Sequence, residues 1–132
     1  KEMAEHFLPY LWERKITLIV PVPLHSRRKR KRGFNQAEIV AKVLSKNTGI
    51  AMDAGAVKRI KATSPQKELG DKGRKRNIRG AFAVQKNVKG ENIVLIDDIY
   101  TTGSTLDEAA RVLKKAGAEK VYFLTVSIGQ GI

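Results

Sequence analysis

Residues 93–105 read IVLIDDIYTTGST, and this stretch decides the fold. Four apolar residues come first, a run that is typical of a strand buried on both faces of a parallel sheet. Two adjacent carboxylates follow, Asp97 and Asp98, and then a turn rich in threonine, glycine and serine. Apolar residues recur at helical spacing from Leu106 to Leu113. We therefore expect a buried strand that passes through a tight turn into a helix.

The charges of this helix also follow the helix dipole. Asp107 and Glu108 are expected in its first turn, and Lys114 and Lys115 in its last. Gly117 then supplies a typical C-terminal stop. These signals support the helix independently of its apolar face.

The same alternation of strands and helices extends over the rest of the chain. Apolar stripes predict further helices at residues 3–12 and 34–44, with Trp12 in the core. Apolar runs predict further strands at residues 16–23, 56–60, 81–84 and 121–128. This order predicts an α/β fold with an open, mostly parallel sheet flanked by helices. The length of 132 residues fits a single domain, residues 1–132.

The composition excludes several classes of protein. The chain has 26 Lys and Arg against 13 Asp and Glu, a formal net charge of +13, and no cysteine. Disulfides, iron–sulfur clusters and thiolate zinc sites are therefore excluded, and no uncharged apolar run reaches the roughly 18 residues of a membrane span. The chain opens on no secretory signal, and it begins at Lys1 rather than Met. We expect a cytoplasmic domain from a longer chain, whose positive charge meets a polyanion.

The turn after the strand at residues 93–96 is an expected phosphate site. Its backbone N–H groups and the helix N-terminus suit a phosphate monoester, and Gly103 lets the backbone approach that phosphate closely. Asp97 and Asp98 suit sugar hydroxyls or the shell of a metal ion. In an open parallel sheet, ligands bind at the carboxyl ends of the strands, where this turn lies. The hydroxyls that can complete the site belong to Thr101, Thr102, Ser104 and Thr105.

Two other segments are unusually basic. Residues 27–32 are six consecutive arginines and lysines that end at Gly33, whereas Lys61–Arg79 is basic and has no periodicity. A connection longer than about 15 residues in a compact domain is usually a functional lid or a disordered segment. We expect Lys61–Arg79 to close over the site, and residues 27–31 to steer anions from a distance.

The motif at residues 94–105 resembles the ribose-5-phosphate motif of type I phosphoribosyltransferases. It departs at Tyr100, where that superfamily usually has an aliphatic residue. Other segments, which with this motif span about residues 16–127, resemble the ComF family of competence-associated phosphoribosyltransferase-like proteins. They are VPVPLH at 20–25, RGFNQA at 32–37, Thr63, Gln66, Asn77 and GAF at 80–82. Members of that family often carry a cysteine-rich zinc ribbon upstream, which this sequence does not contain.

The resemblance implies a type I phosphoribosyltransferase fold with a Rossmann-like core and a long basic flexible loop. Asp97 and Asp98 would be the catalytic pair that holds the ribose hydroxyls of phosphoribosyl pyrophosphate, with magnesium bound near them through the ligand. Residues 101–105 would cradle the 5-phosphate. Arg32 and Gly33 would take the pyrophosphate, whereas Tyr100 would either stack on a base or fill the hood of the pocket. The flexible-loop residues that match the family are Arg59, Thr63, Gln66, Arg74, Arg76 and Asn77.

Two functions stay open. The first is a magnesium-dependent phosphoribosyltransferase that uses phosphoribosyl pyrophosphate, or a nucleoside monophosphate, and a nitrogen nucleophile. The second is a non-catalytic or sensor domain that assists the uptake or processing of single-stranded DNA in natural competence, a role that the resemblance raises. A pI near 10.2 with clustered Lys and Arg is the electrostatic footprint of nucleic-acid binding. The low aromatic content, 6%, argues against a platform on which bases stack.

Overall fold

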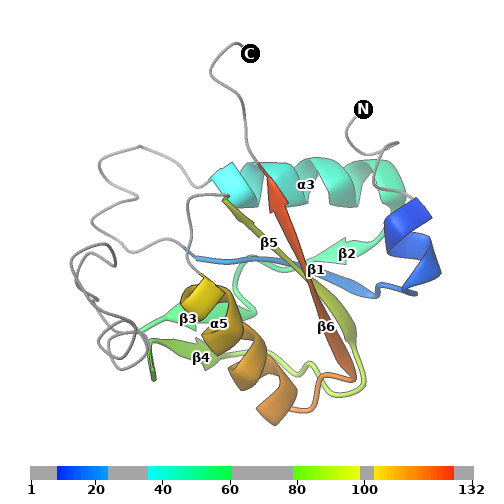
Figure 1. Cartoon of the computed structure of the whole chain (residues 1–132). Helices are drawn as coiled ribbons and strands as arrows, with labels where there is room; N and C mark the ends of the chain where they lie inside the picture. Colours follow the sequence, from blue (N-terminus) through cyan, green and yellow to red (C-terminus); the bar gives the residue numbers. More distant parts are fainter. Residues whose placement is uncertain (1–8, 24–35, 61–78, 99–102, 127–132) are drawn as a thin grey trace.

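The computed structural model describes residues 9–23, 36–60, 79–98 and 103–126, and within them the chain forms two sheets (Figure 1). The larger sheet has four strands in the order β2-β1-β5-β6. Every pairing in it is parallel, which confirms the predicted α/β architecture. Its strands are β1 Leu18–Pro21, β2 Ala51–Met52, β5 Asn92–Asp98 and β6 Lys120–Val126.

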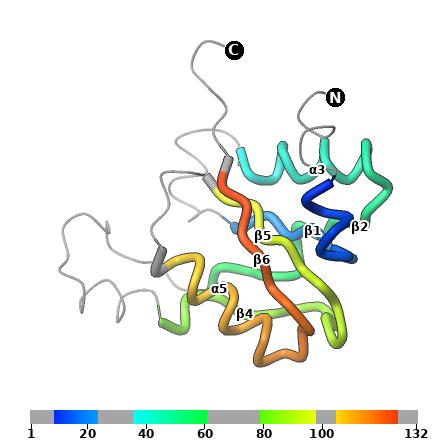
Figure 2. Tube along the Cα trace, turned by 45° about the vertical axis from the view of Figure 1, so that its right-hand side comes forward, coloured from blue at the N-terminus to red at the C-terminus, as the bar shows by residue number. Residues whose placement is uncertain are grey.

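Two long helices cover opposite faces of this sheet (Figures 1 and 2). Helix α3, Gln36–Thr48, connects β1 to β2, and helix α5, Gly103–Lys115, connects β5 to β6. Because successive side chains of a strand point to opposite faces, β5 contributes alternate residues to two separate cores. The core on the α3 side contains Leu11, Ile16, Ile19, Ala37, Val40, Ala41, Leu44, Val94 and Ile96. The core on the α5 side includes Val20, Val22, Ile93, Leu95, Leu106, Ala109 and Leu113.

The direction of chain progression reverses between β1 and β5. From β1 the chain crosses over α3 to β2 on one side, and from β5 it crosses over α5 to β6 on the other. β1 and β5 lie side by side, with Leu18 opposite Ile93 and Pro21 opposite Ile96. Such a reversal opens a crevice at the carboxyl ends of the two central strands, and this is where open α/β sheets bind their ligands.

The predicted strands at 56–60 and 81–84 are present but do not join the parallel sheet. They form an antiparallel pair, β3 Val57–Arg59 with β4 Phe82–Val84. Val57, Ala81 and Phe82 belong to the core on the α5 side, so the pair packs beneath that helix (Figure 1). In their place, β2 is the fourth strand of the main sheet, and it lies in a segment for which the sequence predicted no strand.

Two local expectations are corrected. Helix α5 begins at Gly103, so its first turn contains no acidic residue, and Asp107 and Glu108 lie farther along. Lys114 and Lys115 do occupy its last turn, as expected. Trp12 lies on a helical turn at residues 9–13, but its side chain is 63% exposed, and Leu11 fills the core instead. Among the described residues, no helix is long and apolar enough to cross a membrane.

Candidate functional site

The carboxyl ends of β1 and β5 meet at one corner of the sheet. The N–H of Val22 donates to the carbonyl of Ile96 at 2.9 Å, which extends the pairing one residue beyond β1. The described ranges of the chain end at Pro23, shortly after β1, and at Asp98, the last residue of β5. The predicted pyrophosphate segment and the predicted phosphate turn therefore both depart from this corner.

Asp97 is a buried carboxylate at this corner. It lies on β5 opposite Thr125 of β6, and only 1% of its surface is exposed. Asp97 follows Ile93 and Leu95 in strand alternation, which places its side chain on the α5 side of the sheet. A buried carboxylate is costly unless it has polar partners, and Asp97 does take part in a polar interaction. Asp98 is the last residue of β5, opposite Val126.

Helix α5 is the next described element after β5. Gly103 is its first residue, and Thr105, two residues on, is buried with 5% exposure. The first N–H groups of a helix lack intrahelical acceptors and carry partial positive charge. Because no acidic side chain lies in the first turn of α5, no carboxylate from that turn neutralises this positive end. A helix N-terminus of this kind is suited to a phosphate, and the phosphate site expected there stays a prediction.

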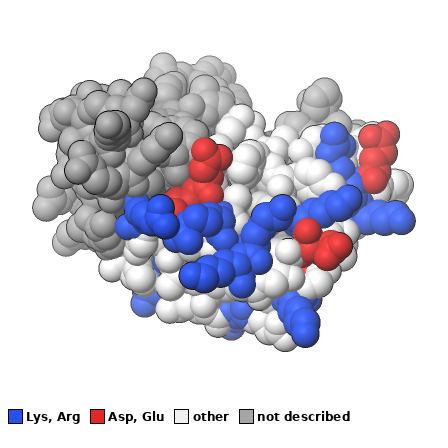
Figure 3. Space-filling model, turned by 60° about the horizontal axis from the view of Figure 1, so that its bottom comes forward, with Lys and Arg blue, Asp and Glu red and all other residues white. Residues whose placement is uncertain are grey.

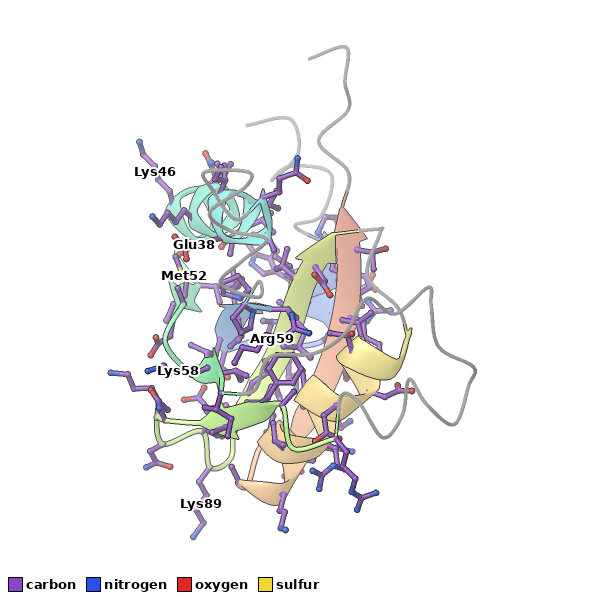
Figure 4. All side chains as sticks on the ribbon, turned by 90° about the vertical axis from the view of Figure 1, so that its left-hand side faces the viewer. Glu38, Lys46, Met52, Lys58, Arg59 and Lys89 are labelled. Carbon is purple, nitrogen blue, oxygen red and sulfur yellow. The ribbon has the colours of Figure 1, made fainter. Side chains whose placement is uncertain are left out.

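Arg59 is placed outside the segment to which it was assigned. It belongs to strand β3, not to a loop, and its guanidinium carbon lies 5.3 Å from the ring centroid of Phe82. Figure 4 labels this side chain on the face of the molecule that carries β3 and β4. The predicted site residues that lie outside the described residues are Arg32, Gly33, Thr63, Gln66, Arg74, Arg76, Asn77, Tyr100, Thr101 and Thr102.

Glu108 is a buried charged residue near the site that the sequence assigned only to the helix dipole. Its carboxylate accepts the N–H of Gly80 at 3.0 Å and two N–H groups of Arg111 at 2.8 and 2.7 Å. The hydrogen bond from Arg111 is the largest cause that lowers the pKa of Glu108; burial opposes it and the bond from Gly80 adds to it. Glu108 therefore joins α5 to the point where the chain enters β4. A Glu–Arg pair at i,i+3 on a helix was the signal in the sequence.

The described residues hold no ready-made metal site. They contain no group of three or more His, Cys, Asp or Glu that could together bind an ion. The donor at the corner is a carboxylate, a hard oxygen ligand of the kind that magnesium accepts while it keeps several waters. This donor set fits a magnesium ion held mainly by a bound phosphate compound.

The chain is similar to known proteins both in sequence and in structure. Residues 14–128 match the family model described as "Phosphoribosyl transferase domain". The chain is 43% identical over 103 residues to the DNA utilization protein YhgH of Salmonella typhi, covering 78% of this chain and 45% of the relative. It is 42% identical over 106 residues to Competence protein F of Haemophilus influenzae, covering 78% and 46%. The chain thus spans less than half the length of these relatives.

Two further similarities are more distant. Competence protein ComFC of Bacillus subtilis is 36% identical over 101 residues, covering 76% of this chain and 39% of the relative. Purine phosphoribosyltransferase from Pyrococcus horikoshii superposes with a TM-score of 0.59 at 21% identity, covering 93% of this chain and 69% of that one. The structural likeness confirms the predicted type I phosphoribosyltransferase fold, and the sequence matches confirm the resemblance to the ComF family.

Proposed function

Because the chain belongs to the phosphoribosyl transferase domain family, we propose that it binds phosphoribosyl pyrophosphate with magnesium and transfers the phosphoribosyl group to a nitrogen nucleophile. The observation that carries this proposal is the buried carboxylate of Asp97 near the end of β5, together with the N-terminus of α5, the next described element, whose first turn has no acidic residue. The proposal gives Asp97 the role of acceptor for sugar hydroxyls and the helix N-terminus the role of donor to a phosphate. Both stand at the reversal of strand order between β1 and β5.

The 5-phosphate would lie on the first turn of α5. Backbone N–H groups there donate to phosphate oxygens, and the helix dipole favours the negative charge. Thr105 belongs to this turn, and the hydroxyls of Thr101, Thr102 and Ser104 would complete the ring of donors. Asp97 and Asp98 would accept hydrogen bonds from the ribose hydroxyls, which fixes the sugar relative to its phosphate.

In the reaction, the nitrogen nucleophile forms a bond to the anomeric carbon as the bond to pyrophosphate breaks. Positive charge develops on the sugar ring, and the departing pyrophosphate takes the electron pair. Arg32 and the basic residues of 61–79 would stabilise that anion electrostatically. Magnesium, bound near Asp97 and Asp98 through ligand oxygens, would supply charge neutralisation.

Calorimetric titration with phosphoribosyl pyrophosphate, with and without magnesium, tests this proposal. We expect magnesium-dependent binding by the parent and its loss in the double variant Asp97→Asn, Asp98→Asn. The matched control is Asp107→Asn with Glu119→Gln, which removes two exposed carboxylates and should leave binding intact. Circular dichroism checks that the first variant is folded. If that folded variant binds phosphoribosyl pyrophosphate as the parent does, Asp97 and Asp98 do not hold the ribose.

The second candidate is a role in handling single-stranded DNA. It is supported by the net charge of +13 and by relatives named for DNA utilization and competence. Binding to a phosphate backbone weakens steeply as salt rises, with a log–log slope of about −0.7 per phosphate contacted in single strands. If DNA is bound, that binding should survive Asp97→Asn with Asp98→Asn, whereas binding of phosphoribosyl pyrophosphate should not. If that variant binds neither DNA nor phosphoribosyl pyrophosphate, the two ligands do not have separate sites.

A further inference from the structure

Three connections meet at the amino edge of the parallel sheet, opposite the candidate site. They are residues 15–17 before β1, residues 86–92 up to the first residue of β5, and residues 114–120 from the last two residues of α5 to the first residue of β6; we call them the three loops. The N–H of Gly90 donates to the carbonyl of Gly117 at 2.9 Å, and the N–H of Thr17 donates to the carbonyl of Asn92 at 2.8 Å. These bonds hold the loops side by side. We call the lysines on them the amino-edge lysines: Lys15, Lys86, Lys89, Lys114, Lys115 and Lys120.

All six amino-edge lysines are exposed. Within the described part of the chain, ion pairs join Arg14 to Glu13, Lys42 to Glu38 and Arg111 to Glu108, and none of these includes an amino-edge lysine. The same loops contain two acidic residues, Glu91 and Glu119, and Glu91 accepts the hydroxyl of Thr17. The loops therefore carry a surplus of four positive charges. Figure 3, in which the bottom of the view in Figure 1 comes forward, shows many Lys and Arg side chains on this side of the molecule, with fewer Asp and Glu among them.

The helix dipole accounts for only part of this charge. Lys114 and Lys115 lie in the last turn of α5, where cations are favoured. Lys86, Lys89 and Lys120 lie on turns or at a strand start, where no such effect applies. Figure 4 shows the side chain of Lys89 extending away from the fold. Lys15 also has φ of 52°, a left-handed backbone conformation that is unfavourable for a residue with a Cβ.

The candidate site does not explain these lysines either. β5 runs from Asn92 at the amino edge to Asp98 at the carboxyl edge, about 20 Å at roughly 3.3 Å per residue. A bound sugar phosphate at one end cannot contact lysines at the other. A larger polyanion is the ligand class that a surplus of exposed lysines on one edge would attract.

We infer that the amino-edge lysines bind the phosphodiester backbone of a nucleic acid without reading its sequence, an inference that rests on the second candidate function above. Lysine contacts phosphate as a point charge, whereas base readout requires planar donors or stacking rings, and the three loops contain no aromatic residue. The exposed large apolar side chains of the described chain are Trp12, Ile39, Ile60 and Phe123, all outside these loops. The surface therefore lacks the apolar residues that a stable membrane contact adds to basic charge.

Fluorescence anisotropy with a labelled single-stranded DNA of mixed sequence tests this inference. The edge variant is Lys86→Gln, Lys89→Gln, Lys120→Gln. The matched control is Lys42→Gln, Lys46→Gln, Lys58→Gln, which removes the same charge from exposed positions on α3 and β3. Figure 4 shows Lys46 and Lys58 extending in other directions from Lys89. Both variants change exposed side chains, so both should fold.

We expect the edge variant to lose about tenfold or more in affinity, with a log–log salt slope less negative by about 2, since three contacts at about 0.7 each are removed. The control should stay within about threefold of the parent. Equal loss in both variants, parent-like binding by the edge variant, or binding to vesicles containing phosphatidylserine in place of DNA would overturn the inference. The edge variant should bind phosphoribosyl pyrophosphate with the same affinity as the parent. The titration therefore tests the sugar-phosphate proposal separately from the binding of DNA.

Discussion

The carboxylate of Glu108 accepts the backbone N–H of Gly80 at 3.0 Å, so helix α5 holds the chain where it enters β4. Gly80 has φ of 76°, and β4 pairs with the strand that carries Arg59. One side chain thus connects helix α5 to the antiparallel pair. A substitution of Glu108 should therefore affect the pair of β3 and β4 as well as α5.

The contact of Glu108 should make stability depend on pH. Its pKa is lowered in the folded protein, chiefly by the hydrogen bond from Arg111. Its contribution is therefore fully present above the ordinary glutamate pKa and is lost as pH falls through the lowered value. We expect Glu108→Ala to cost about 1–3 kcal/mol at neutral pH, since the N–H of Gly80 loses its acceptor. The difference from the parent should shrink in acid.

Urea unfolding of parent and variant across the acidic range measures this effect. Glu119→Gln, at an exposed position, is the control and should change stability by less than about 0.5 kcal/mol. A difference between Glu108→Ala and the parent that stays constant down to strongly acidic pH would show that the charge of Glu108 contributes nothing.

The exposure of Trp12 should be visible in its fluorescence. It is the only tryptophan of the chain, and 63% of its surface is exposed. We expect red-shifted emission and quenching by acrylamide nearly as efficient as for free tryptophan. Unfolding in urea should then change the emission little. A blue-shifted, poorly quenched spectrum in the folded protein would place Trp12 in the core, as its sequence pattern suggested.

The sequence predicted what depends on local periodicity. The runs at 16–23, 93–96 and 121–128 became parallel strands, and the stripes from 34 and 106 became α3 and α5. The antiparallel pairing of β3 with β4 was not predicted, because Arg59 and Phe82 meet across a long separation in sequence. The two-residue strand β2 is too short to show alternation.

Individual side chains show the same limit. Helical spacing placed both Leu11 and Trp12 on an apolar face, but only the fold decides which of two neighbours points inward. Glu108 was visible as a charge on a helix, whereas its partner Gly80 lies 28 residues away. The buried position of Asp97 was predictable, because it continues a strand that is apolar on both faces.

Two glycines with similar backbone requirements should respond differently to alanine. Gly49 has φ of 79° with nothing within 4 Å of an added Cβ, so Gly49→Ala should cost only backbone strain, about 1 kcal/mol. Gly117 has φ of 111°, and its Cβ would lie 3.3 Å from the Cα of Lys89. The hydrogen bond from Gly90 to Gly117 restrains that backbone. We therefore expect Gly117→Ala to be the more destabilising in thermal unfolding; equal costs would contradict the close contact of the two turns.

An acidic residue placed at the start of α5 should raise stability and lower ligand affinity together. The first turn of α5 contains no acidic residue. The negative charge of Ser104→Asp should therefore interact favourably with the helix dipole and stabilise the fold by about 0.3–1 kcal/mol. The same carboxylate would repel a phosphate bound at those N–H groups, and we expect the affinity for phosphoribosyl pyrophosphate to fall at least tenfold. Gln85→Glu adds the same charge at an exposed position and should leave affinity unchanged. Thermal unfolding and calorimetric titration of both variants separate the two effects. If Ser104→Asp binds the sugar phosphate as the parent does, the 5-phosphate does not lie on α5.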